Sequence, residues 1–172
     1  VTDLDSPRAF AILDPARTPL VAVRGTARAP RVPGFGTYTL EWGVGVEPTT
    51  FTTFAAGVLP APPILGTLDL STIPFDPSGP ATDPNVFTVT LRLRALDARG
   101  NAGEDRRAVF VRHDPSIRSG FPKDLQGSAE GSPILVDLDG DGKLEIVLGT
   151  ADGEVLAFDA GGRLPPRFPA AV

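Results

Sequence analysis

Residues 38–46 read Tyr-Thr-Leu-Glu-Trp-Gly-Val-Gly-Val, and an apolar side chain stands at every second position of this stretch. Residues 87–95, Phe-Thr-Val-Thr-Leu-Arg-Leu-Arg-Ala, repeat the pattern with threonine and arginine between the apolar residues. Successive side chains of a β-strand point to opposite faces of its sheet, so this alternation predicts strands with one buried and one solvated face. Trp42 falls on the apolar side and is expected in the core.

Further strands are expected around these two. The candidates are residues 10–13, 20–27, 64–70 and 107–112. Turns are predicted at Pro33-Gly34, Pro77-Ser78-Gly79 and Arg99-Gly100-Asn101. Six or seven strands in about a hundred residues predict two packed antiparallel sheets, so residues 1–114 are expected to form an immunoglobulin-like β-sandwich.

The pattern changes after Pro133. Residues 134–136, 146–148 and 155–158 are short, continuous apolar runs, which favour strands buried on both faces. Tight turns at Asp152-Gly153 and Gly161-Gly162 predict a three-stranded meander. Residues 115–127, rich in glycine and proline, are expected to be a linker, and residues 128–172 a separate unit. Residues 164–172 are interpreted as a fragment of a next sheet.

The loop between the first two of these runs is acidic. Residues 137–145 read Asp-Leu-Asp-Gly-Asp-Gly-Lys-Leu-Glu, which places carboxylates at positions 1, 3, 5 and 9. Calcium takes six to eight oxygen ligands, so several must converge from a short, curled backbone. Gly142 is expected to have a positive φ that allows this curl. Lys143 would offer its backbone carbonyl oxygen and direct its side chain to water.

Other interpretations of residues 137–145 fit the sequence less well than a calcium site does. An EF-hand needs a glutamate at position 12 between helices, where this chain has Leu148 in an apolar run. Magnesium is disfavoured by its stricter octahedral geometry. A metal-free turn rich in aspartate and glycine is the remaining alternative, although its carboxylates would repel one another.

Residues 132–149 resemble the FG-GAP/VCBS repeat of integrin-type β-propellers. The resemblance rests on Val-Asp-Leu-Asp-Gly-Asp-Gly at 136–142 and Glu-Ile-Val-Leu-Gly at 145–149. It implies a β-propeller blade, present here as a fragment, with a calcium ion in the loop between its first two strands. The implied ligands are Asp137, Asp139, Asp141, the Lys143 carbonyl and Glu145. The family usually has aspartate at the last position, so Glu145 is a departure.

The N-terminal region has a looser resemblance. Val-Arg-Gly-Thr-Ala at 23–27, Tyr-Thr-Leu-Glu-Trp-Gly at 38–43 and Asp-Ala-Arg-Gly-Asn at 97–101 are similar to segments of bacterial immunoglobulin-like or fibronectin-like modules of secreted proteins. In those modules, the last of these segments forms the turn before the final strand. The resemblance therefore implies a bacterial, extracellular or cell-surface protein, with the periplasm as an alternative location.

Composition excludes several functions. The net charge of -5, with scattered arginines, argues against nucleic-acid binding. The absence of cysteine excludes disulfides, thiolate zinc sites and a cysteine nucleophile. No apolar run is long enough to span a bilayer. Because the 172 residues contain no methionine, we expect the chain to be a piece of a longer protein.

No enzyme is predicted. His113 is the single histidine, and although Asp114, Ser116 and Ser119 are close in sequence, neighbours in sequence rarely assemble a catalytic triad. We therefore expect a non-catalytic adhesion or scaffolding module with a protein or surface-glycan partner. It would self-associate or pack against further propeller blades.

Two alternatives remain open. Residues 149–159 are similar to blades of quinoprotein (PQQ-type) propellers, some of which are dehydrogenases, but no tryptophan docking position follows Trp42. The chain could also be an accessory module of a secreted protease.

Overall fold

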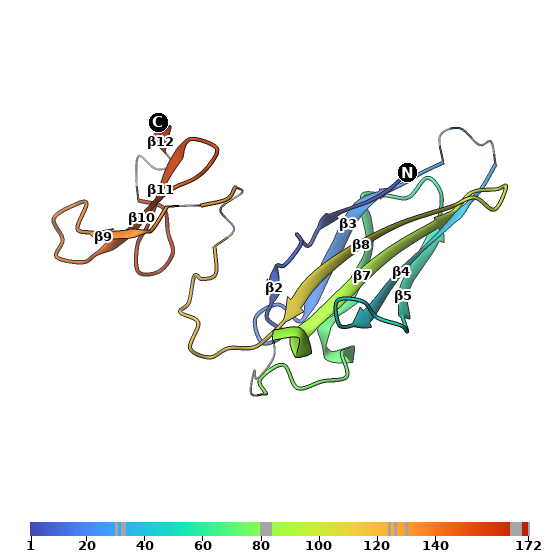
Figure 1. The fold of residues 1–172 in the computed structure, drawn as a ribbon, viewed down its shortest axis with the longest axis horizontal. Coiled ribbons are helices and arrows are strands. Elements are labelled where there is room, and N and C mark those ends of the chain that lie inside the picture. Colours follow the sequence, from blue (N-terminus) through green and yellow to red (C-terminus); the bar gives the residue numbers. More distant parts are fainter. Residues whose placement is uncertain are drawn as a thin grey trace. The chain divides into compact units, whose positions relative to one another are not determined.

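The computed structural model describes residues 1–29, 31, 34–79, 84–123, 125, 127–129, 131–165 and 170–171. Among these residues, the regular elements are β-strands and two single-turn 3-10 helices, η1 (Leu70–Thr72) and η2 (Pro84–Phe87) (Figure 1). The fold is therefore all-β, as predicted. The chain divides into two compact units, Val1–Asp114 and Pro115–Val172.

One sheet of the first unit has three antiparallel strands in the order β1-β3-β6. They are β1 (Thr2–Ser6), β3 (Leu20–Ala27) and β6 (Ile64–Asp69). β3 has the predicted bounds. β6 ends one residue early because Leu70 begins the 3-10 turn that the Asp69 side chain caps. β1 was not predicted from the sequence, since Leu4 is its one large apolar residue.

The other sheet of this unit has five strands in the order β2-β8-β7-β4-β5. They are β2 (Ile12–Leu13), β8 (Ala102–Val111), β7 (Thr88–Leu96), β4 (Thr37–Val44) and β5 (Thr52–Val58). Neighbours are antiparallel except β2 and β8, which run parallel. The two alternating stretches of the sequence are β4 and β7, which pair along their length.

Several predicted boundaries in this sheet are wrong. Phe10, expected in a strand, has φ 62°, a left-handed conformation that leaves only Ile12–Leu13 extended. β4 stops at Val44 because Gly45 has φ 94°. β8 begins five residues before the predicted 107, in a polar segment without large apolar side chains. β5 was not predicted, since its threonines, alanines and glycine give no clear alternation.

One hydrophobic core joins the inner faces of the two sheets. The three-stranded sheet contributes Leu4, Val23 and Leu68, and the five-stranded sheet contributes Leu40, Leu91, Leu93 and Val109, all at most 1% exposed. Trp42 lies in the same cluster with 7% exposure, as predicted. The alternation in the sequence therefore records which face of each strand is buried.

Three hairpin turns share one hydrogen-bond pattern. They span residues 97–101, 150–154 and 159–163, and in each the first residue's N–H donates to the carbonyl oxygen of the fifth. The fourth residue is a glycine with φ 82° at Gly100, 80° at Gly153 and 72° at Gly162. A three-residue hairpin loop needs a left-handed residue at this position, and glycine adopts it without strain. The predicted turns at 99–101, 152–153 and 161–162 are thus confirmed.

The sheet of the second unit has the order β12-β11-β10-β9, with antiparallel pairing throughout. Its strands are β9 (Ile134–Val136), β10 (Glu145–Gly149), β11 (Glu154–Phe158) and β12 (Ala170–Ala171). The predicted meander is β9-β10-β11. Ala170 and Ala171 pair with β11 in this sheet, so at these two residues the interpretation of residues 164–172 as part of a next sheet is wrong. Residues 166–169 and 172 lie outside the described residues.

Burial differs across this sheet. Leu156, Ala157 and Phe158 of β11 are at most 7% exposed, whereas Ile134 and Leu135 of β9 are 59% and 64% exposed. Within the described chain, the expected burial on both faces therefore holds for β11 and not for β9.

Part of the segment predicted to be a linker packs on this unit. A Cβ atom on Gly120 would lie 1.8 Å from the carbonyl oxygen of Gly161. Only glycine allows the two backbones to approach so closely, so residue 120 packs directly against the turn at residues 159–163.

Candidate metal centre

The acidic loop connects the first two strands of the C-terminal sheet. β9 ends at Val136 and β10 begins at Glu145, and these two residues are register partners. The pairing brings the two ends of the loop together, so residues 137–144 must curl within a short span. Strands therefore flank the loop on both sides, as predicted.

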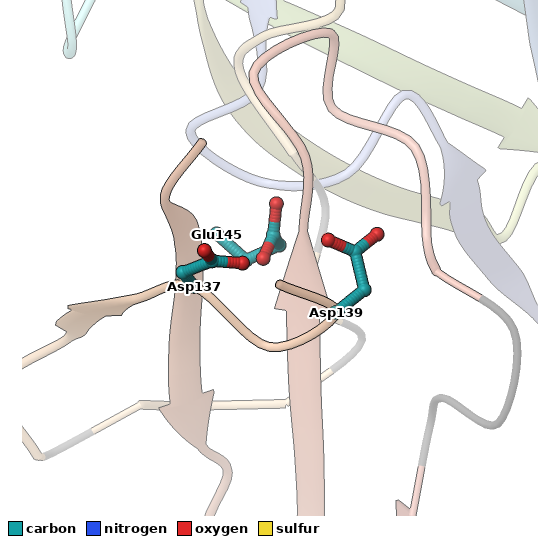
Figure 2. Close-up of side chains that lie close together, drawn as sticks. All are labelled: Asp137, Asp139 and Glu145. Carbon is teal, nitrogen blue, oxygen red and sulfur yellow. The ribbon is translucent and has the colours of Figure 1, made fainter. Parts of the chain in front are cut away.

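Three carboxylates converge inside the loop. Asp137, Asp139 and Glu145 each place an oxygen atom within 4.8 Å of the other two (Figure 2). Anionic groups this close repel one another unless a proton or cation intervenes. Carboxylate oxygens are the preferred ligands of hard divalent cations, so this group could hold a metal ion.

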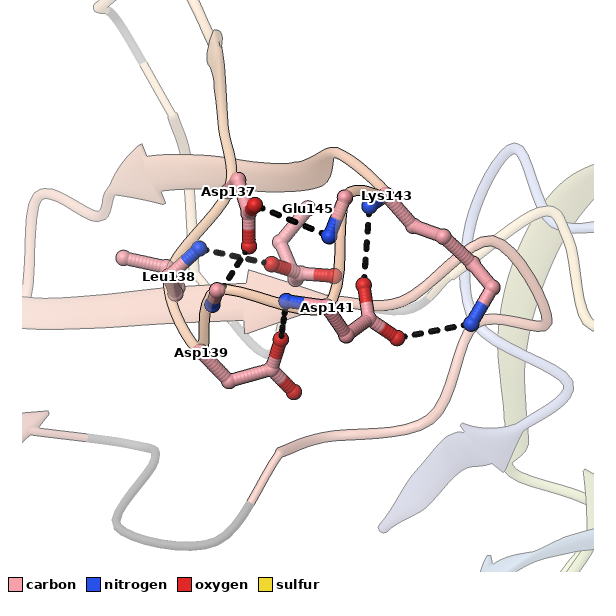
Figure 3. Close-up of polar contacts among 8 residues, drawn as sticks. Asp137, Leu138, Asp139, Asp141, Lys143 and Glu145 are labelled. Atoms are coloured by element: carbon pink, nitrogen blue, oxygen red, sulfur yellow. Dashed lines mark hydrogen bonds and ion pairs between the residues drawn. The ribbon is translucent and has the colours of Figure 1, made fainter.

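Hydrogen bonds to Asp137 account for the curl (Figure 3). Its Oδ1 accepts the N–H of Gly140 at 2.7 Å, and its Oδ2 accepts the N–H of Gly142 at 3.0 Å. Both glycines have positive φ, 79° and 82°. The value at Gly142 confirms the conformation expected from the sequence. The first aspartate thus organises the backbone that positions the other acidic residues.

Glu145 is the most enclosed member of the group. It is 5% exposed, and its Oε2 accepts the N–H of Leu138 at 2.9 Å. Its other carboxylate oxygen receives no hydrogen bond from the residues that the structure describes. Among the described residues, Thr88 Oγ1 is the one fully buried side-chain oxygen without a partner, so this oxygen of Glu145 is open to solvent. A cation between Glu145 and the two aspartates could therefore reach it.

Asp141 and Lys143 are oriented differently. The Lys143 Nζ lies 2.6 Å from Asp141 Oδ2, and the Lys143 N–H donates to Asp141 Oδ1 at 2.8 Å (Figure 3). The hydrogen bond from the lysine side chain lowers the pKa of Asp141, and the same contact raises the pKa of Lys143. The lysine side chain lies mostly in water, as expected, with 73% exposure, and its Nζ also contacts this aspartate.

The structure thus divides the five expected metal-site residues. Asp137, Asp139 and Glu145 lie together, while the Asp141 carboxylate is paired with Lys143 and lies outside their group. The resemblance made Glu145 a departure from the family pattern, yet it lies in the same group as Asp137 and Asp139, and its register partner is Val136, the residue before Asp137. The pairing of β9 with β10 therefore determines the position of Glu145, and the sequence motif alone does not reveal that pairing.

The histidine has a partner that the sequence did not suggest. His113 Nδ1 lies 3.0 Å from Asp14 Oδ1, and Asp14 Oδ2 lies 3.3 Å from Arg17 Nε. This Asp14–His113 pair joins the end of β8 to the turn after β2 in the first unit. Ser116 and Ser119, considered as nucleophiles, belong to the second unit. The contacts of His113 are those of a structural link.

Comparison of the chain with models of known protein families, with curated proteins and with solved structures finds no match. Among the described residues, no helix is long and apolar enough to cross a membrane.

Proposed function

We propose that this chain is a calcium-stabilised, non-catalytic adhesion or scaffolding module of a larger bacterial secreted or cell-surface protein. The observation that carries the proposal is the convergence of Asp137, Asp139 and Glu145 in one curled loop. Binding a cation there would remove the repulsion between the carboxylates and join the loop to both flanking strands. The metal would then act on stability rather than on chemistry.

The choice of calcium follows from the ligand chemistry. Every candidate side-chain ligand is a carboxylate oxygen, which suits a hard cation and excludes softer metals that prefer sulfur or imidazole. Calcium tolerates irregular geometry and six to eight ligands, whereas magnesium demands a near-ideal octahedron. The Lys143 carbonyl, the Asp141 carboxylate and water would complete the shell beyond the three clustered carboxylates.

The architecture supports a modular role. Two sheets around one core fit an immunoglobulin-like β-sandwich in the first unit. In the second unit, a meander with a fourth short strand fits one blade of an FG-GAP/VCBS-type propeller. Ile134 and Leu135 of β9 leave apolar surface that a neighbouring blade, a second copy or another protein would cover. The partner of the whole module would be a protein or a surface glycan.

Thermal unfolding with and without calcium tests the proposal. Calcium that binds only the folded loop stabilises it by about 2.7 kcal/mol at a hundredfold excess over the Kd. We expect calcium to raise the Tm, EDTA to reverse the rise, and Asp139→Ala to remove most of it. Asp5→Ala removes an exposed carboxylate of β1 and should respond to calcium like the unmodified protein. A Tm that is the same in calcium and in EDTA would exclude the metal site.

A further inference from the structure

The acidic loop shares a cavity with a second turn of the same unit. The cavity has a volume of about 380 Å³. The loop lines it with Asp139, Asp141, Lys143 and Glu145. The hairpin turn after β11 lines it with Asp159 and Arg163, among others. The backbone of Gly120 packs closely against that turn at Gly161.

Asp159 presents a carboxylate oxygen that its own turn does not use. Its Oδ1 accepts the N–H of Gly161 at 2.7 Å and that of Arg163 at 2.8 Å. Its Oδ2 receives no hydrogen bond from the residues described in the structure. The hydrogen bond from the Arg163 N–H lowers the pKa of Asp159, so this carboxylate is anionic at neutral pH. A negative charge therefore stands in the wall of the cavity that the acidic loop also lines.

We propose that Asp159 is an outer-sphere residue of the calcium site, whose free oxygen accepts hydrogen bonds from water molecules on the cavity side of the ion. The inference rests on the proposed function. Asp159 lines the cavity but does not belong to the close group formed by Asp137, Asp139 and Glu145, and we assign it a contact through water because its own turn holds its other oxygen. Calcium needs six to eight oxygens, and a cavity of about 380 Å³ has room for several water ligands.

Arg163 offers a second test of the role of Asp159, because it lines the same cavity and carries a positive charge where Asp159 carries a negative one. Its backbone N–H, not its side chain, closes the turn on Asp159. Arg163→Gln therefore removes a cation near the site and leaves the turn's hydrogen bond available. If the wall faces the ion, the two substitutions must change calcium affinity in opposite directions.

The test is calcium titration by calorimetry at low ionic strength, where interactions between charges are least screened. Asp159→Asn keeps an acceptor for the turn but removes the charge. We expect it to weaken calcium binding by about tenfold, the lower end for loss of an outer-shell partner. Arg163→Gln should tighten binding by about twofold or more. Asp97→Asn is the matched control, because Asp97 Oδ1 accepts the N–H groups two and four residues later in the same type of turn.

The outcomes distinguish a failure of the inference about Asp159 from a failure of the proposed calcium site. If the unmodified protein and Arg163→Gln bind calcium equally and Asp159→Asn stays within twofold of both, the role of Asp159 is wrong while the metal site stands. If Asp97→Asn weakens binding as much as Asp159→Asn, the effect is general charge and the inference fails. If the circular dichroism of Asp159→Asn in EDTA shows misfolding, Arg163→Gln decides alone, and unchanged affinity overturns the inference. If the unmodified protein binds no calcium, the proposed function itself fails.

Discussion

Asp141 and Lys143 show how a neighbour changes what an acidic residue can do. Both are exposed, with side-chain exposures of 42% and 73%, yet they form a close ion pair. Exposed pairs contribute little to stability, so the lysine can be displaced at small cost. In the proposed calcium-bound state, Asp141 would leave Lys143 and turn toward the ion. The pair would then compete with metal binding.

This competition predicts the effect of Lys143→Gln. Removing the cation frees Asp141 and reduces the positive charge beside the site, so calcium should bind about threefold more tightly at low salt. Calorimetric titration measures the change. Arg99→Gln, which removes an exposed cation from the turn at residues 97–101, should leave the Kd unaltered. A weaker affinity in Lys143→Gln would show that the lysine side chain supports the loop instead.

Among the elements, the acidic loop depends on its glycines more than its ligand motif indicates. Gly140 and Gly142 donate N–H groups to Asp137 only because both have positive φ. A Cβ atom at Gly142 would meet no atom within 4 Å, so space is not the constraint. The constraint is the left-handed conformation, which costs a residue with a side chain roughly 1–2 kcal/mol.

Gly142→Ala should therefore weaken calcium binding by about fivefold to thirtyfold, which corresponds to that cost. The measurement is the calcium Kd, with the Tm in EDTA as a check on the fold. Gly149→Ala is the control, since Gly149 lies in β10, has open space around it and has no positive φ. Equal calcium affinities for Gly142→Ala and Gly149→Ala would mean that the calcium-bound loop does not need the left-handed conformation at residue 142.

In the molecule as a whole, the largest hydrophobic core and the candidate metal group are made of different residues. The core of the first unit is made by residues of both its sheets, and the carboxylate group belongs entirely to the second unit. Leu93, on β7, is 0% exposed at the centre of that core. A substitution there should affect folding without changing the chemistry of the loop.

Leu93→Ala is expected to destabilise the first unit by about 2–5 kcal/mol through lost burial and a residual cavity. Urea unfolding followed by the fluorescence of Trp42, the only tryptophan, reports on this unit. The calcium Kd of the folded variant should equal that of the unmodified protein. Leu20→Ala, at a position 58% exposed, should change stability by no more than about 0.5 kcal/mol. A large change in the calcium Kd of Leu93→Ala would show that the core of the first unit and the carboxylate group of the second unit are not independent.

Several features followed from the sequence alone. The all-β class, the strands β3, β4 and β7, the meander and the positive φ of Gly142 were all predicted. The reason is that these features are local. Strand alternation, left-handed glycines and hairpin turns depend on the conformational preferences of a few neighbouring residues.

Other features were decided by tertiary structure. β1 and β5 have weak patterns and exist because neighbouring strands supply hydrogen-bond partners. The partnership of His113 with Asp14 joins residues 99 positions apart. Strand register brings Glu145 back to Asp137 and Asp139, and a separate hairpin brings Asp159 to the same cavity. The sequence determined which residues could bind a cation, but only chain folding determined which of them meet, because distance between side chains depends on strand pairing and not on spacing along the chain.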